Sequence, residues 1–395
     1  MPLRCKTERW VASRYVVRIP YAGRRPEWRL NLGSLRRLSE SSAIRAAAHC
    51  LAGTWQPEKL LKTSGYYLAS DEAHSKPTTI NLLTINLFYA LMTSFTSASQ
   101  FPTAPVSTVP DVAPPLAESH RRSVLKRHSV RVIGQGKPPM LLCNGFGCTQ
   151  HIWHYLITAL AVQHQVIVFD YVGSGESDLS AYSPQKYATL AGYAQDVVEI
   201  CQALNLREAI LVGHSVGATI AMLAANQAPQ HFAKVVLLAP SPCYINEPGY
   251  YGGFERADLL QVLAAMEVDY KGWTTVFAAL LLGPTNTASL GEELANFFCE
   301  TNSAIARQFA RVTFLSDNRA DVGRLSIPTL VVQCTDDVAG PPEVGAYLLA
   351  HLPQGKLVTL STAGHCPHLS APLETLAVLK AFAAPAAAAI KSCLR

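Results

Sequence analysis

Short apolar runs alternate with helix-period segments along the chain from about residue 122. The runs are aliphatic or β-branched and are bounded by Gly, Pro or Asp: Met140–Cys143, Val166–Phe169, Ala209–Val212, Val235–Leu238, Thr329–Gln333 and Leu357–Leu360. Runs that are apolar on both faces are typical of strands buried in a parallel sheet. The alternation predicts an α/β fold whose mostly parallel sheet is covered by helices on both faces, with an edge strand over Ser129–Ile133.

One interval, about 249–317, contains helical patterns and no strand pattern. Helices are expected there over Phe254–Met266, Tyr270–Leu282, Leu290–Cys299 and Ser303–Leu315. Gly283-Pro284 separates the second from the third, and Asn302 is placed to cap the fourth. A block of helices between two strands of a sheet predicts an inserted four-helix lid.

The first third of the chain differs in composition from the rest. Residues 1–37 contain ten Lys or Arg and two acids, which fits either an organelle transit peptide or a basic extension. Residues 94–120 contain five prolines and no Lys or Arg, so an extended linker is expected there. We therefore expect an N-terminal extension of unclear structure over 1–93, a linker over 94–120 and one sheet domain over 121–395.

Composition and charge narrow the classes of function. The 395 residues are 49% apolar and 15% charged, with a net charge of +5, while residues 121–395 carry 19 basic and 20 acidic side chains. The sheet domain therefore lacks the basic surface of a nucleic-acid binder. The most apolar stretch, Ile80–Met92, is 13 residues long, whereas a bilayer span needs about 20. Neither a nucleic-acid partner nor a membrane span is expected.

The ten cysteines show no CxxC spacing, so the sequence predicts neither a zinc site nor a disulfide scaffold. Scattered cysteines in apolar segments are typical of reduced thiols, which favours the cytoplasm; import into an organelle through the basic N-terminus is the alternative. His368, three residues after His365, has no third ligand at a suitable spacing. The Gly173-Ser174-Gly175 turn lacks the third glycine of a dinucleotide site. No metal and no cofactor are expected.

A nucleophile is suggested by Gly213-His214-Ser215-Val216-Gly217, which follows one predicted strand and opens a helix. A sharp strand-to-helix turn holds its serine in a strained conformation that small neighbours permit, and it exposes the hydroxyl to a base. The helix N-terminus adds backbone donors and a positive dipole end. Ser215 is the predicted nucleophile; the alternative is a glycine-rich turn with an idle serine.

A serine nucleophile needs a histidine base and a carboxylate that orients the histidine, in the chain order serine, acid, histidine. The last two predicted strands lead into Asp336-Asp337 and into His365. Asp337 is preferred over Asp336 because it stands four residues before Pro341, where the next helix begins. The predicted catalytic residues are Ser215, Asp337 and His365.

Acyl transfer also needs N–H donors for the developing oxyanion. The N–H of Val216, directly after the serine, is one predicted donor. The second is the N–H of Phe146 in Asn144-Gly145-Phe146-Gly147, which follows an early predicted strand. The alternative for this segment is a glycine turn in which Phe146 is an ordinary core residue.

Several motifs go beyond this general pattern: Asn144–Cys148, Phe169–Gly175, Gly213–Gly217, Pro240–Tyr244, Tyr250–Phe254 and Gly364–His368. Over about residues 122–385 the chain resembles the family of the bacterial stress-pathway hydrolase RsbQ and, less closely, the plant strigolactone and karrikin receptor hydrolases. The resemblance implies an α/β-hydrolase fold with a V-shaped lid over a small apolar cavity, and it places the triad and the oxyanion donors on the residues named above. It also implies pocket-lining positions at His214, Phe254, Trp273, Phe277 and Phe314. Without the resemblance, the spacing of Trp273 and Phe277 favours plain helix packing.

These observations predict a serine hydrolase that acts through an acyl-enzyme on a small apolar ester or lactone-like ligand. The resemblance implies that it has a signalling role in a stress response. The alternative is a slow or non-catalytic ligand receptor that regulates a signalling protein partner through its lid. A carboxylate nucleophile, as in dehalogenases of the same fold, is disfavoured because a serine occupies the turn.

Overall fold

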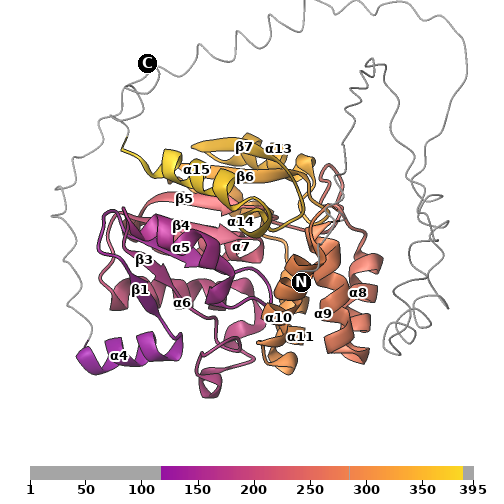
Figure 1. The fold of residues 1–395 in the computed structure, drawn as a ribbon, viewed down its shortest axis with the longest axis horizontal. Coiled ribbons are helices and arrows are strands. Elements are labelled where there is room, and N and C mark those ends of the chain that lie inside the picture. Colours follow the sequence, from indigo (N-terminus) through magenta and orange to yellow (C-terminus); the bar gives the residue numbers. More distant parts are fainter. Residues whose placement is uncertain (1–116, 284, 386–395) are drawn as a thin grey trace, which may run out of the picture. The chain divides into compact units, whose positions relative to one another are not determined.

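The computed structural model describes residues 117–283 and 285–385, which form a mostly parallel sheet with helices on both faces (Figure 1). The order of the strands in this part of the chain is β1-β3-β2-β4-β5-β6-β7, and β1 runs antiparallel to β3. Their bounds are β1 (Arg131–Ile133), β2 (Met140–Cys143), β3 (Val166–Val168), β4 (Ala209–His214), β5 (Phe232–Leu238), β6 (Thr329–Asp336) and β7 (Gly355–Ala363).

The central strands are apolar on both faces because helices cover both sides of the sheet. Every residue of β2, β3 and β4 is buried, and Leu141 of β2 pairs with Ile167 on one side and Leu211 on the other. The edge strand β1 has two exposed residues out of three. The predicted fold class, a mostly parallel sheet covered on both faces, is confirmed.

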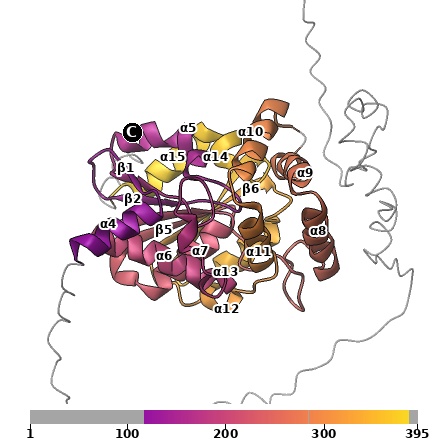
Figure 2. The ribbon, with the colours of Figure 1, turned by 90° about the horizontal axis from the view of Figure 1, so that it is seen from below.

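Two groups of helices cover the sheet, one on each face (Figure 2). Helix α5 packs with α14 and α15 on one face, and α6 packs with α4 and α7 on the other. Their bounds, with those of two further helices, are α4 (Glu118–Arg127), α5 (His154–Ala161), α6 (Leu190–Ala203), α7 (Val216–Gln227), α12 (Arg319–Val322), α13 (Pro342–His351), α14 (Pro367–Ser370) and α15 (Pro372–Ala383).

Between β5 and β6 the described part of the chain has five helices, and the first four of them are drawn in orange to brown beside the sheet in Figure 1. The second, third and fourth of these helices each begin at a capping side chain that accepts an N–H group of the first turn: Asp269, Thr287 and Asn302. These caps separate the four helices from one another. The four helices, which we call the lid, are α8 (Arg256–Val268), α9 (Tyr270–Leu282), α10 (Ala288–Cys299) and α11 (Ser303–Phe314).

The bounds of most elements differ from the sequence prediction by a few residues, and two of these differences concern the lid and the linker. The first lid helix begins at Arg256 rather than at Phe254, because the backbone of Phe254 is hydrogen-bonded to Tyr244 and Asn246. Helix α4 begins at Glu118, so the predicted end of the linker at residue 120 lies inside a helix. The predicted extension over 1–93 and the remainder of the linker up to residue 116 lie outside the described residues.

Among the described residues, none of the helices combines the length and the apolar character that a bilayer crossing requires.

Candidate active site

Ser215 stands at the sharp turn where β4 passes into α7. Its φ of 56° lies in a region that L-residues rarely adopt, and its N–H donates to the carbonyl of Leu238 at 2.9 Å. The turn needs glycine on both sides: a Cβ at Gly213 would lie 2.2 Å from the carbonyl oxygen of Gly217, and one at Gly217 would lie 2.2 Å from that of Asn144. The two glycines therefore allow a strained serine at the carboxyl edge of the sheet.

His365 and Asp337 continue from Ser215 as one hydrogen-bonded chain. His365 Nε2 lies 2.7 Å from Ser215 Oγ, and His365 Nδ1 lies 2.8 Å from Asp337 Oδ2. Asp337 Oδ1 also accepts the N–H groups of Ala339 and Gly340, at 2.9 and 3.1 Å. All three side chains of the triad are buried. Because the carboxylate holds the proton of Nδ1, Nε2 is left as the acceptor for the serine hydroxyl.

The two adjacent candidate acids point in different directions. Asp336 is the last residue of β6 and is exposed, and its backbone carbonyl accepts the N–H of Gly364 at 2.7 Å. Successive side chains along a strand point to opposite faces, so the two carboxylates cannot both face His365. The structure brings Asp337, the preferred candidate, to His365 and leaves Asp336 at the surface.

Phe146 and Val216 bring backbone N–H groups to the neighbourhood of the serine. Phe146 lies on the loop after β2, and Val216 is the first residue of α7. The loop passes close to the serine turn, since a Cβ at Gly145 would lie 3.5 Å from Ser215 Cβ. Within the described part of the chain, neither N–H donates to another group of the protein. Free N–H groups beside a nucleophile are suited to bind an oxyanion.

A small cavity adjoins Ser215 and His365. The cavity has a volume of about 20 Å³, which is room for one or two water molecules. The wall is formed by Phe146, Cys148, His214, Ser215, Tyr244, Phe277, Leu281, Leu294, Phe298, Thr313, Phe314, Ala339, His365 and Cys366.

Residues 140–378 match the model of the alpha/beta hydrolase family. The chain belongs to the alpha/beta hydrolase family. It is 37% identical over 258 residues to a probable esterase of Oryza sativa subsp. japonica, with 65% of this chain and 95% of the relative covered. It is 35% identical over 257 residues to "Karrikin insensitive 2 receptor CA" of Petunia hybrida, with 65% and 95% covered.

A solved structure of a hydrolase is also similar to this chain. The structure of a hydrolase from Oleispira antarctica is 38% identical and superposes with a TM-score of 0.65, covering 67% of this chain and 97% of that one. The resemblance to the plant strigolactone and karrikin receptor hydrolases that the motifs predicted is confirmed. A role in a stress response stays a prediction.

Three of the five predicted pocket residues line the cavity of this hydrolase, namely His214, Phe277 and Phe314. The ring of His214 lines the cavity next to Ser215, and the rings of Phe277 in α9 and Phe314 in α11 line it from the lid. The rings of Phe277 and Phe314 also pack on each other, with centroids 6.0 Å apart. The ligand space is therefore enclosed jointly by the sheet domain and the lid.

The other two predicted pocket residues, Trp273 and Phe254, are not part of the cavity wall. Trp273 stacks on Phe277 with ring centroids 4.4 Å apart and packs edge-on against Phe146, so it supports the wall from behind. Phe254 is held in the segment before α8, where its N–H donates to the carbonyl of Tyr244 at 3.1 Å. That these two side chains line a ligand pocket stays a prediction.

Sequence reasoning missed two hydroxyl groups of the cavity wall. The hydroxyl of Tyr244 lies 3.5 Å from Ser215 Oγ, and burial raises the pKa of Tyr244 to about 12, so the phenol is protonated at neutral pH. Thr313 Oγ1 is buried and has no hydrogen-bond partner among the described residues. The position of Tyr244 shortly after β5, at the same sheet edge as Ser215, could have indicated from the sequence that its hydroxyl lies near the serine. Thr313 lies in the interior of a helix, and no sequence pattern indicated that its hydroxyl faces the cavity.

Two neutral histidines pack beside the triad. His214 Nε2 donates to the backbone carbonyl of His365 at 2.9 Å, and its ring centroid lies 4.3 Å from that of His368. Burial lowers the pKa of His214 to about 3 and the pKa of His368 well below its usual value. His368 also packs against Trp153, with ring centroids 4.8 Å apart. Both rings therefore contribute packing around the triad rather than charge.

One cluster of the described residues has the donor types of a metal site. Ligand atoms of His128, Asp196 and Glu199 lie within 4.8 Å of one another. Lys186 Nζ lies 2.5 Å from Asp196 Oδ1, and Arg127 pairs with Glu199. Because two cationic side chains already neutralise both carboxylates, this cluster is a largely buried ion-pair network.

The end of α9 is bonded to the loop that carries His365. The backbone N–H of His365 donates to the carbonyl of Leu281 at 2.6 Å. The side-chain amide of Asn286 donates to the carbonyls of Leu282 and Ala363, at 2.6 and 3.3 Å. The lid therefore contacts the loop that carries His365 through hydrogen bonds as well as through apolar packing.

Proposed function

We propose that this protein hydrolyses a small ester or lactone through an acyl-enzyme formed on Ser215. The observation that carries the proposal is the buried chain Ser215, His365 and Asp337, with hydrogen bonds of 2.7 and 2.8 Å at the carboxyl edge of the sheet. A serine hydroxyl is a weak nucleophile until a base in hydrogen-bond contact removes its proton. The distance between Ser215 and His365 meets that requirement.

In the proposed reaction His365 Nε2 takes the proton of Ser215 Oγ as the oxygen attacks the carbonyl carbon. The N–H groups of Phe146 and Val216 bind the oxyanion that forms. When the tetrahedral intermediate collapses, the ester C–O bond breaks and His365 gives its proton to the leaving oxygen. A water molecule then adds to the acyl group with His365 as base, and the acid is released with Ser215 restored.

The cavity wall supports a small, mainly apolar ligand that carries at least one additional polar group. The wall is dominated by aromatic and aliphatic side chains, and its space is small. Thr313 supplies a buried hydroxyl without a partner among the described residues, which costs free energy until a ligand pairs it. The hydroxyl of Tyr244 is close enough to Ser215 to contact the reacting group of a bound ester.

Intact-mass measurement after exposure to a fluorophosphonate and to a panel of small esters tests the proposal. We expect one adduct per chain, mapped by peptide analysis to Ser215, and competition by esters whose acyl part carries a hydroxyl or ether oxygen. Ser215→Ala is the control and is expected to stay unlabelled. Adducts at another residue, or equal labelling of the variant, would contradict the assignment.

A second candidate function is that of a ligand receptor that regulates a protein partner through its lid. The relative from Petunia hybrida is named a receptor, and the lid carries apolar side chains at the surface. On α8 and α9 these are Leu260, Val268, Val276 and Leu280, which are 45%, 80%, 53% and 50% exposed. Exposed apolar side chains of this kind are suited to a partner with a complementary apolar face.

Val276→Glu tests the receptor function, with Val162→Glu as the matched control at the end of α5, where Val162 is 79% exposed. A protein captured by the wild type is purified and titrated calorimetrically against each variant. We expect Val276→Glu to weaken binding at least about tenfold, since a charge is desolvated at the interface, and to leave ester turnover within about twofold. Equal binding by all three proteins, or fast multiple turnover without any partner, would count against a receptor.

A further inference from the structure

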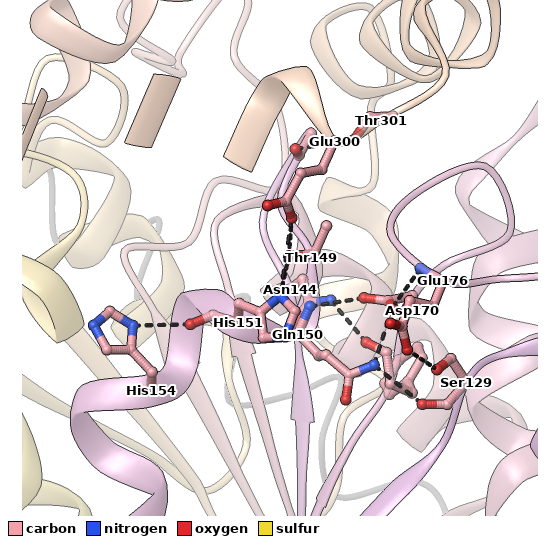
Figure 3. A network of polar contacts seen from close by, with 12 residues as sticks. Ser129, Asn144, Thr149, Gln150, His151, His154, Asp170, Glu176, Glu300 and Thr301 are labelled. Carbon is pink, nitrogen blue, oxygen red and sulfur yellow. Dashed lines mark hydrogen bonds and ion pairs between the residues drawn. The ribbon is translucent and has the colours of Figure 1, made fainter. Parts of the chain in front are cut away.

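The loop that carries Phe146 is anchored to the sheet domain at both of its ends. At the start of the loop, Asn144 Nδ2 donates to the carbonyl of Phe169 at 2.8 Å. At the end, the backbone N–H of Gln150 donates to the buried carboxylate of Asp170 at 2.7 Å (Figure 3). These contacts fix where the loop leaves and rejoins the sheet domain, but they do not reach the segment 147–149 between them.

The middle of the same loop is held by the lid. Thr301 Oγ1, at the corner between α10 and α11, donates to the carbonyl of Gly147 at 3.0 Å. Thr149 Oγ1 donates to the carboxylate of Glu300 at 2.9 Å, as drawn in Figure 3. Thr301 is 7% exposed, so its hydroxyl has little access to water as an alternative partner.

The corner between α10 and α11 is itself hydrogen-bonded to the sheet domain, so it can hold the 147–149 segment in a fixed position. The N–H of Asn302 donates to the carbonyl of Gly173 at 2.9 Å, and the N–H of Gly175 donates to the carbonyl of Glu300 at 3.2 Å. Thr301 and Ser174 thereby form an isolated antiparallel bridge. These backbone bonds do not depend on the Thr301 side chain, so the hydroxyl can be removed while the corner stays in place.

The backbone conformation at Gly147 restricts the position of the neighbouring Phe146 N–H. Gly147 has a φ of +65°, and a Cβ there would lie 2.8 Å from the ring of Phe298 on α10. The carbonyl that Thr301 holds is one residue from Phe146, whose N–H is the proposed oxyanion donor. A displacement of about 1 Å in such a donor can cost a factor of about 10² in rate.

We infer that Thr301, assisted by Glu300, is a positioning residue: the lid corner holds the 147–149 segment so that the Phe146 N–H faces the oxyanion. The role rests on the proposed function above. This role makes the lid part of the catalytic geometry, because the hydrogen bonds between the lid corner and the loop also fix the position of the Phe146 N–H. We expect the ground-state binding of the ester to change little when the Thr301 hydroxyl is removed, since Thr301 itself does not line the cavity.

Thr301→Val and Thr301→Ser test the role with a generic aryl ester. The valine variant keeps the shape and loses the donor, so we expect kcat to fall about fivefold to twentyfold with KM within about twofold. The serine variant keeps the donor and is expected to restore kcat. Hydrogen exchange of the 145–149 amides should rise about threefold or more in the valine variant only. Thr275→Val, at an exposed position of α9, is the control and should match the wild type in both measurements.

Thr149→Val provides an independent variant, since it removes the bond to Glu300 from the other side. It should reproduce the loss of kcat and the faster exchange even if Thr301→Val folds poorly. Wild-type kcat and wild-type loop exchange in both valine variants would overturn the positioning role while leaving Ser215 as nucleophile. If the wild type itself shows no Ser215-dependent turnover, the proposed function fails, and loop exchange alone then decides whether Thr301 holds the loop.

Discussion

Ser215→Ala is expected to lower the rate of aryl-ester hydrolysis by about 10⁵-fold to 10⁶-fold. The hydroxyl oxygen is the atom that forms the acyl bond, and no other group takes over that bond when it is removed. The fold is expected to survive, because alanine keeps the Cβ and the backbone N–H of residue 215 still donates to the carbonyl of Leu238. Initial rates give the first result, and thermal unfolding gives the second.

Ser370→Ala is a suitable control for this variant. Its hydroxyl lies on the segment that follows His365, where it donates to the carbonyl of Cys366 at 3.3 Å, and it does not contact the triad. We expect its turnover to stay within about threefold of the wild type. Near-normal turnover in Ser215→Ala would exclude the acyl-enzyme mechanism, whatever the control does.

Asp337→Asn is expected to lower kcat by about 10⁴-fold, with little change in KM. The carboxylate accepts the Nδ1 proton of His365 at 2.8 Å and accepts two backbone N–H groups on its other oxygen. An asparagine retains one acceptor, and the backbone N–H groups compete for it. The amide NH₂ then faces His365, favours a proton on Nε2, and so removes the acceptor for the serine hydroxyl.

The adjacent residue supplies a matched comparison with the same chemical change. Asp336→Asn alters an exposed carboxylate whose side chain does not contact His365, so its kcat should remain within about threefold of the wild type. Circular dichroism of both variants establishes that the fold is intact. A larger loss in Asp336→Asn than in Asp337→Asn would transfer the role of the acid to Asp336.

The sheet and the order of its chemical groups could be predicted because each depends on short-range patterns. Buried parallel strands need apolar residues on both faces, and the runs at Met140–Cys143 and Ala209–Val212 show this directly. The carboxyl ends of parallel strands meet at one edge, so residues that follow different strands converge there. Ser215, Asp337 and His365 each follow such a strand, which is why the structure brings these three predicted residues together.

The wall of the cavity depended on the packing of the lid, which no local pattern specifies. Helical periodicity indicates which face of α9 is apolar, but not that Phe277 of this face reaches the cavity while Trp273 stops behind it. The same limit applies to Thr313, whose hydroxyl lies in the cavity wall only because of the way α11 packs on the rest of the protein.

The sequence by itself determined the fold class, the serine turn and the order of the groups that follow the strands. Only the tertiary structure decided which lid residues meet the sheet domain, including Thr301 at Gly147 and Leu281 at His365. The physical reason is that strand order and turn chemistry depend on neighbours in the chain. Contacts between the lid and the sheet domain depend instead on the angles and rotations at which separately formed helices pack, and these are fixed by many weak interactions at once.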